Sequence, residues 1–207
     1  LSEDGVEACL LGEVYGEADP AAAALSVARG DRPAADLSGH WLLVAWRPAE
    51  RRWHVWTDRF GTLHAYHAES PGGAALGTRF RDVASAASRR ELDTEAIGAF
   101  LYLGFFPFDR TYYSDVHIVP PASHLVLDAD GRRPRCERTW RWEHTPNHRR
   151  RHDDTVAEFG ERFEAVMGDI TREGRIAVPI SGGLDSRSTV AALRDPGQRF
   201  WSYSYGY

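Results

Sequence analysis

The stretch that decides the fold runs from Ile176 to Leu193 and reads IAVPISGGLDSRSTVAAL. Its first five residues form a short apolar run typical of a buried strand, and Ser186 to Leu193 has a helical pattern. Phe200 to Tyr205 follows as a second candidate strand. Strand, helix and strand in this order predict the start of a parallel α/β sheet.

Between that strand and that helix lies the loop SGGLDS, residues 181–186. Its two adjacent glycines allow a tight turn and a close approach of the backbone to an anion, and the helix dipole points its positive end at the same place. Ser181 and Ser186 add hydroxyl donors, while Asp185 offers a hard oxygen to the Mg²⁺ that accompanies a nucleotide. We expect a phosphate-binding loop; the alternative is a glycine turn whose Asp and Ser only cap a helix.

Composition excludes several other classes of protein. All 25 basic residues are Arg, which excludes a Walker A loop and a Schiff-base lysine, because both need Lys. A net charge of −5 with mixed signs predicts no nucleic-acid partner. Two cysteines, Cys9 and Cys136, make neither a disulfide framework nor a zinc site. With no membrane-length apolar run and no signal peptide, we expect a cytoplasmic protein without a membrane partner.

The chain before the linker is expected to be rich in short strands. A hairpin is predicted from 40–46 and 51–56, and further strands near 63–68, 74–78 and 123–128, the last ending in an Asp130-Gly131 turn. One helix is expected at 94–103, capped by Asp93 and stopped by Gly104. The polar stretch 144–152 reads as a linker, and after it Thr155 and Glu158 have the spacing of a capping box opening a helix that ends near Gly174.

The histidines and tryptophans are given ordinary roles. His54, His64 and His67 are expected to be hydrogen-bonded strand residues, and His144, His148 and His152 solvated. The seven Trp residues are assigned to packing.

The SGGLDS loop resembles the signature of the ATP pyrophosphatases of the asparagine synthetase family over all six residues. In that family ATP is cleaved between its α and β phosphates to adenylate a carboxylate, and an amine then displaces AMP to leave an amide. The resemblance implies that pyrophosphate would be cradled by Ser181, Gly182, Gly183 and Ser186, with Leu184 in the same loop. It also implies that Asp185 would bind Mg²⁺ and that the strand from Trp201 to Ser204 would flank the adenosine of ATP.

The resemblance continues upstream to about residue 10. Gly12-Glu13-Val14-Tyr15, Leu37 to Trp41, Asp58 to Gly61 and Leu92 to Pro121 are similar to the family's glutaminase domain. The implied fold class is an α+β glutaminase-like domain with antiparallel sheets, residues 1–145, followed by the start of an α/β parallel-sheet ATP pyrophosphatase domain, residues 146–207. Because the chain begins at Leu1 and ends inside an expected strand, we expect a piece of a longer protein.

The glutaminase resemblance has departures that bear on activity. The family's nucleophile is an N-terminal Cys that uses its own α-amino group as base, a role that Cys9 cannot take from inside the chain. The position of the family's oxyanion-hole Asn holds Leu11, which has no side-chain donor. We therefore expect no catalytic residues for glutamine hydrolysis here.

The resemblance as a whole implies an ATP-dependent, asparagine synthase-type ligase that uses ATP and Mg²⁺ on a small-molecule or peptide carboxylate, in a possible homodimer. An alternative is a glutamine-independent family member, such as a β-lactam synthetase or a lasso-peptide macrolactam cyclase. A second alternative is a non-catalytic module that binds nucleotide or a partner.

Overall fold

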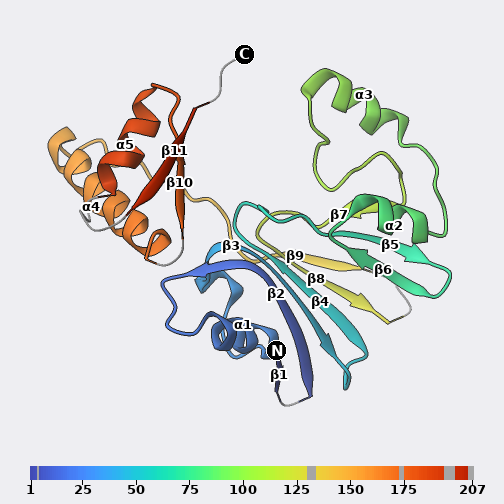
Figure 1. The fold of residues 1–207 in the computed structure, drawn as a ribbon. Helices are drawn as coiled ribbons and strands as arrows, with labels where there is room; N and C mark the ends of the chain where they lie inside the picture. Colours follow the sequence, from blue (N-terminus) through green and yellow to red (C-terminus); the bar gives the residue numbers. More distant parts are fainter. Residues whose placement is uncertain (4, 130–133, 173–174, 194–198, 205–207) are drawn as a thin grey trace. The chain divides into compact units, whose positions relative to one another are not determined.

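The computed structural model describes residues 1–3, 5–129, 134–172, 175–193 and 199–204. It divides into two compact units, Leu1–Trp142 and Glu143–Tyr207, shown from blue to yellow and from orange to red in Figure 1. The predicted Asp130-Gly131 turn lies outside the described residues. Within the described residues, no helix is both long and apolar enough to cross a bilayer.

The first unit is built on a six-stranded antiparallel sheet. Its strand order is β1 (Ser2–Glu3), β2 (Val6–Tyr15), β3 (Ser38–Arg47), β4 (Arg52–Thr57), β8 (Ser123–Asp128) and β9 (Arg135–Arg138). The predicted hairpin is confirmed as β3 and β4, and the 123–128 strand as β8. Alternation along β3 sends Leu42 to one face and Trp41 and Leu43 to the other, so both faces of this sheet are apolar.

A second, three-stranded sheet packs on one of these faces. Its order is β6 (Gly73–Gly77), β5 (Tyr66–Ser70) and β7 (Val116–Ile118), again antiparallel. Leu42, Val55 and Leu125 of the large sheet form a buried core with Ala65 and Val119. β5 begins later than the predicted strand near 63–68.

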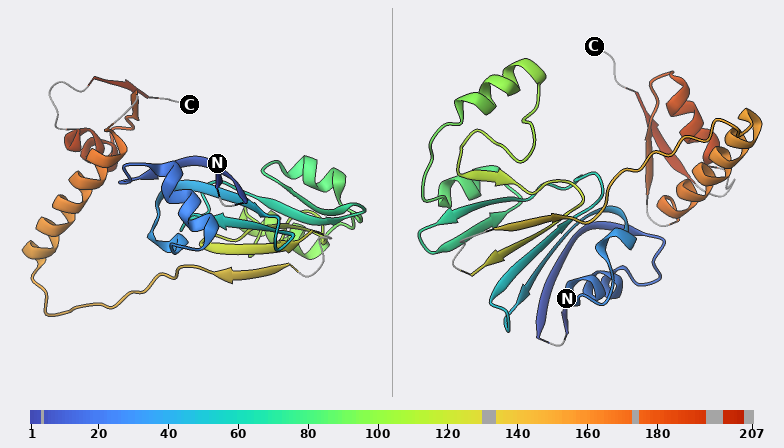
Figure 2. Two further views of the ribbon diagram at one scale, coloured as in Figure 1. Left: turned by 90° about the horizontal axis from the view of Figure 1, so that it is seen from below. Right: turned by 180° about the vertical axis from the view of Figure 1, so that it is seen from behind.

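Two helices cover the outer faces of the two sheets. α1 (Pro20–Arg29) lies on the outer face of the large sheet (Figure 2). Its Val27 and Ala28 form one buried cluster with Trp41 and Leu43 of that sheet. α2 (Phe80–Ala86) packs Val83 on the small sheet. The layers of this unit are therefore helix, sheet, sheet and helix.

The third helix of this unit, α3 (Thr94–Leu103), is the one that the sequence predicts. Asp93 accepts the Ala96 amide at 2.9 Å, and Gly104 ends the helix in the left-handed conformation, so the predicted cap and stop are confirmed. The expectation of a single helix before the linker is wrong, because α1, α2 and the short 3-10 helix η1 (Ala34–Asp36) also form. Half of α1 is alanine and α2 has only seven residues, so neither offers the run of large apolar residues that marks α3.

Two glycines allow β2 and β3 to approach closely where β2 ends. A Cβ on Gly12 would lie 2.0 Å from the His40 carbonyl oxygen, and one on Gly39 would lie 2.2 Å from that of Glu13. Both residues have positive φ, 88° and 136°. Only glycine fits this crossing without moving the backbone.

The second unit contains α4 (His152–Ile170), β10 (Ile176–Pro179), α5 (Leu184–Ala192) and β11 (Phe200–Tyr203). β10 and β11 pair in parallel, with Ile176 opposite Phe200 and Pro179 opposite Tyr203. The strand–helix–strand prediction is confirmed for these elements. α4 begins three residues before the predicted capping box and has no side-chain cap at Arg151. The capping-box prediction is wrong because Thr155 lies inside α4, where its hydroxyl donates to the Arg151 carbonyl oxygen at 3.2 Å, and Glu158 pairs with Arg150 and Arg162.

Candidate functional site

The SGGLDS loop joins the carboxyl end of β10 to the amino end of α5. Gly182 has a φ of 78°, a left-handed conformation that favours glycine, and Gly183 is the N-cap of α5. The predicted strand, loop and helix arrangement is therefore present around residues 181–186. α5 starts at Leu184, two residues before the predicted helical segment.

Two hydroxyl groups hold the loop together. The Ser181 backbone N–H donates to Ser186 Oγ at 3.3 Å, and the two Oγ atoms lie 3.4 Å apart. Ser186 Oγ also donates to the Gly183 carbonyl oxygen at 3.1 Å. Ser181 and Ser186 are thus brought together across the turn, on an exposed part of the surface that a ligand can reach.

Backbone N–H groups at this turn are left available. Among the residues that the structure describes, none accepts a hydrogen bond from the N–H of Gly182, Leu184 or Asp185. The Gly183 N–H donates to Ser181 Oγ at 3.4 Å, so it is not one of the available donors. The available groups are the donors that every α-helix leaves unpaired at its amino end. With the positive end of the helix dipole, they provide an electrostatic environment suited to an anion.

Ser204 lies at the same edge of the strand pair as the loop. Pro179 is in register with Tyr203, and the Ile180 N–H donates to the Tyr203 carbonyl oxygen at 2.8 Å. Ser204 follows immediately, so the two segments that leave β10 and β11 start side by side. In open α/β sheets, ligands bind outside the carboxyl ends of the strands, which is the edge that Ser181 and Ser204 share.

Asp185, the predicted metal ligand, is exposed in the first turn of α5. The described residues contain no cluster of three or more His, Cys, Asp or Glu side chains that could hold a metal ion. A single carboxylate nevertheless fits Mg²⁺, which commonly takes one or two protein carboxylates and completes its shell with phosphate oxygens and water. The donor set at this loop is therefore compatible with a metal that arrives with a nucleotide.

Arg187 is a loop contact that the sequence analysis missed. Its Nη2 donates to the Gly182 carbonyl oxygen at 3.0 Å and its Nε to that of Gly183 at 3.3 Å. The sequence feature that could have predicted this contact is the position of Arg187 four residues after Gly183, a spacing that places two residues on the same side of a helix.

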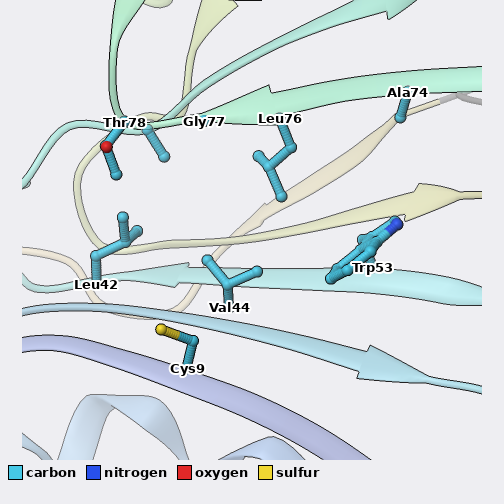
Figure 3. Close-up of a pocket in the computed structure, with 9 residues that line it drawn as sticks. Cys9, Leu42, Val44, Trp53, Ala74, Leu76, Gly77 and Thr78 are labelled. Carbon is cyan, nitrogen blue, oxygen red and sulfur yellow. The ribbon is translucent and has the colours of Figure 1, made fainter.

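The first unit has a separate cavity between its two sheets, of about 340 Å³. Figure 3 shows Cys9 of β2 and Val44 of β3 on one side and Leu76 of β6 on the other, with Trp53 at one end. The lining is mostly apolar. Cys9 lies inside β2, and Leu11 follows two residues later on the same face of the strand; both side chains are exposed. Neither residue provides the polar donors of an oxyanion hole.

Histidines form two cross-strand pairs in this unit. His54 Nδ1 lies 3.0 Å from His124 Nε2 across β4 and β8, and the His67 and His117 rings stack at 5.4 Å across β5 and β7. Burial lowers the pKa of His54 and of His67 to about 4. The prediction of hydrogen-bonded strand histidines is right for His54. It is wrong for His67, which is stacked, and for exposed His64, neither of which makes a hydrogen bond with a described residue.

The remaining aromatic and histidine predictions have mixed outcomes. Trp41 and Trp56 are buried as expected, but Trp142 and Trp201 are about three-quarters exposed, so not every Trp serves packing. His144, His148 and His152 are exposed, as predicted. Cys9 and Cys136 are free thiols.

Comparison with known proteins identifies a family for the first unit. A family model described as a glutamine amidotransferase domain matches residues 22–140, more than half of the chain. No curated protein matches the chain significantly. The matched range begins inside α1 and ends just after β9, so it leaves out β1 and β2 of the large sheet. The antiparallel sheets with their helices fit the glutaminase-like fold expected for this part of the sequence. The chain belongs to the glutamine amidotransferase domain family.

Proposed function

We propose that this chain is part of an ATP-dependent, amide-bond-forming ligase of the asparagine synthase type. In the proposed reaction, a carboxylate oxygen of the substrate attacks the α-phosphorus of ATP, the bond from that phosphorus to the bridging oxygen breaks, and pyrophosphate leaves. An amine nitrogen then attacks the activated carbonyl carbon, loses a proton and displaces AMP. The substrate class is a small-molecule or peptide carboxylate.

One observation carries this proposal: the SGGLDS loop occupies the turn from a parallel strand into a helix, in the same chain as an amidotransferase-family domain. Backbone donors at Gly182, Leu184 and Asp185 are free to meet the pyrophosphate oxygens. Ser181 and Ser186 offer hydroxyls on the same turn, and Ser204 leaves the neighbouring strand beside it. The adenosine would lie along that neighbouring segment.

The metal in this proposal is Mg²⁺. Asp185 is the residue that would hold it, together with phosphate oxygens and water. When bound, the ion would neutralise charge on the departing pyrophosphate. The protein's own contribution is to fix the phosphates with backbone amides and two serines.

A second candidate, a ligase that takes its amine from the substrate instead of from glutamine, is favoured by the cavity in the first unit. Cys9 lies inside β2, and Leu11, at the position that resembles the family's oxyanion-hole Asn, has no side-chain donor. The inter-sheet cavity is mostly apolar: its lining includes the Thr78 hydroxyl but no charged side chain that could pair with the α-amino and α-carboxyl groups of glutamine. β-lactam synthetases and lasso-peptide macrolactam cyclases have this kind of chemistry.

Titration calorimetry of the purified protein with ATP, with and without Mg²⁺, tests the ligase proposal. We expect Mg²⁺-dependent binding that is weakened at least about tenfold by Asp185→Asn, through loss of a metal ligand. Asp169→Asn, which removes an exposed carboxylate from α4, serves as the matched control and should bind as the unchanged protein does. Absence of Mg²⁺-dependent ATP binding would overturn the proposal. Binding without pyrophosphate release on any carboxylate would support the non-catalytic module.

Glutamate release from glutamine separates the two nitrogen sources. We expect the unchanged protein to release glutamate no faster than a Cys9→Ala variant does. Release that disappears in Cys9→Ala would assign glutamine as the source of nitrogen.

A further inference from the structure

A second cavity of the first unit, of about 520 Å³, shares no lining residue with the inter-sheet cavity that Cys9 lines. Its walls come from the turn after β4, from β5 at Tyr66, from the start of α2 at Phe80, from the end of α3 with the segment that follows it, and from β7 at Ile118. Small-molecule sites commonly have volumes of about 300–1,000 Å³. Five separate segments of the chain therefore surround a space of suitable size for a small ligand.

Aromatic rings form much of the wall of this cavity, and several of them hold one another in place. Phe80 contacts Tyr66 at 5.6 Å between ring centroids, with the ring planes 71° apart. Phe106 contacts Tyr112 at 4.6 Å in a similar edge-to-face arrangement and stacks on Phe100 at 4.8 Å. These are favourable ring geometries, so the wall is already ordered before a ligand arrives.

Three further phenylalanines that line the cavity are exposed to solvent. The exposed fractions are 69% for Phe60, 60% for Phe105 and 90% for Phe108. None of the three rings contacts another aromatic ring of a described residue. Exposed apolar surface that gathers around one cavity is typical of a binding site, because a ligand that covers it removes that surface from water.

The backbone of Phe108 is strained as well. Its φ is 60°, in the left-handed region that a bulky side chain rarely adopts. Because the ring is almost fully exposed, packing within the described structure does not offset this strain. Strain of this kind gathers at ligand-binding positions, where it holds a side chain ready for the ligand. The strained and exposed Phe108 is therefore a sign of a ligand that is independent of the cavity itself.

The polar groups that line the cavity restrict the chemistry of its ligand. The charge of Arg110 is already compensated, because its guanidinium binds Asp93 at 2.6 Å and Glu95 at 2.8 Å. Tyr66 and His64 contact each other edge to face at 6.3 Å, and neither side chain makes a hydrogen bond with a described residue. Burial raises the pKa of Tyr66, so its hydroxyl is a neutral donor at neutral pH. Hydrogen-bonding groups are thus available to a ligand, whereas an unpaired arginine charge is not.

We infer that this cavity binds a neutral, planar aromatic molecule of one or two rings that carries a hydrogen-bonding group. Its rings would pack against the aromatic wall and cover Phe108, and its polar group would pair with the Tyr66 hydroxyl. A charged molecule would lose its hydration without gaining an unpaired opposite charge, and a purely apolar one would leave the hydroxyl without a partner. This inference goes beyond the proposed ligase activity and does not depend on the SGGLDS loop.

Equilibrium dialysis of the purified protein with 2-naphthol, a neutral two-ring molecule with one hydroxyl, tests the inference. Two related probes test the chemistry: trans-decahydro-2-naphthol keeps the hydroxyl but has no aromatic ring, and 2-naphthoate keeps the rings but carries a negative charge. We expect 2-naphthol to bind at a single site and at least about fivefold more tightly than either of the other two. Absence of 2-naphthol binding, or equal binding of the three probes, would overturn the inference.

Variants of the lining residues locate the site. Tyr66→Phe keeps the ring and removes the hydroxyl, so it should weaken 2-naphthol binding about fivefold through loss of one hydrogen bond. Tyr113→Phe removes a hydroxyl from a half-buried tyrosine outside the lining and is its matched control. Phe108→Ala should also weaken binding several-fold, whereas Tyr102→Ala, at an equally exposed ring outside the lining, should not. Binding that neither Tyr66→Phe nor Phe108→Ala weakens would place the probe elsewhere and overturn the assignment.

Thermal unfolding separates a binding role of Phe108 from a structural one. A ring that the fold needs would lower the melting temperature of the ligand-free protein when it is removed. We instead expect Phe108→Gly to melt no lower than Phe108→Ala, because glycine adopts the positive φ without strain, and both variants to gain less stability from 2-naphthol than the unchanged protein does. Light scattering after size-exclusion chromatography tests the other occupant. Self-association that Phe108→Ala abolishes, without binding of 2-naphthol, would assign this surface to a second copy of the chain and overturn the inference.

Discussion

The Asp58 carboxylate accepts the backbone N–H of Trp41 at 3.2 Å, joining the turn after β4 to the strand beside it. Asp58 is almost completely buried, and it also accepts the N–H groups of Phe60 and Thr62 and the Thr62 hydroxyl. One side chain therefore fixes the whole turn that leads from the large sheet toward the small one.

We predict that Asp58→Ala destabilises the protein by about 2–4 kcal/mol, because several donors lose their acceptor in a buried site. Urea denaturation followed by tryptophan fluorescence measures the change. Asp31→Ala, at an exposed ion pair with Arg29, is the control and should shift stability by less than about 0.5 kcal/mol. Equal effects of the two substitutions would show that the buried hydrogen bonds contribute little.

The glycine crossing of β2 and β3 gives a second prediction. Gly12→Ala should destabilise by more than about 2 kcal/mol, since its Cβ would overlap the His40 carbonyl oxygen and its φ is positive. Gly98→Ala, in α3 where a Cβ meets nothing within 4 Å, should instead stabilise by about 0.5–1 kcal/mol. Urea denaturation of the two variants beside the unchanged protein measures both changes in the free energy of unfolding. The prediction requires these two changes to have opposite signs.

The stability of the first unit should depend on pH through His67. Burial, with a smaller contribution from neighbouring His117, lowers its pKa to about 4, below the ordinary value of 6.5. The neutral form is favoured in the folded state, so its stability is complete above about pH 6.5 and falls as the pH drops toward 4. Asp109 opposes this effect only partly.

We therefore expect the free energy of unfolding to fall by about 1–3 kcal/mol between pH 7.5 and pH 5 or below, with His67 as one contributor. His67→Phe should flatten the dependence, whereas His64→Asn, at an exposed ring, should leave it unchanged. If the stability of His67→Phe falls with pH as steeply as that of the unchanged protein, the pH dependence belongs to other groups, such as buried His54.

The cap of α3 allows a local test. Asp93 accepts the Ala96 N–H and binds Arg110 through two nitrogens at 2.9 and 2.6 Å, which lowers the pKa of its carboxyl group. Asp93→Ala should speed amide hydrogen exchange in the first turn of α3 several-fold and leave α1 unaffected. Mass-spectrometric exchange on both helices measures this difference. Unchanged exchange in α3 would mean that packing, and not the cap, holds the helix end.

Local chemistry made part of this structure predictable. The two ends of α3 were predictable because its N-cap, Asp93, and its terminating glycine, Gly104, are short-range signals. The position of the SGGLDS loop between a strand and a helix was predictable from its glycines and the apolar run before it. α1 was missed because five of its ten residues are alanine, a residue that packs in the core without marking a face. The Arg187 contacts depend on side-chain rotamers, and the histidine pairs on strand register, which a single sequence does not specify.

The pairing of β4 with β8 has a consequence for how this chain folds. His54 and His124 lie 70 residues apart in sequence, and Arg52 and Asp128 lie 76 apart, yet both pairs meet on one sheet. The small sheet, α2 and α3 are all encoded inside that interval. Closing so long a loop costs chain entropy before any strand contact repays it. We expect the first unit to fold in the slow range of small domains, on the order of milliseconds to seconds, with compaction of the inserted segment setting the rate.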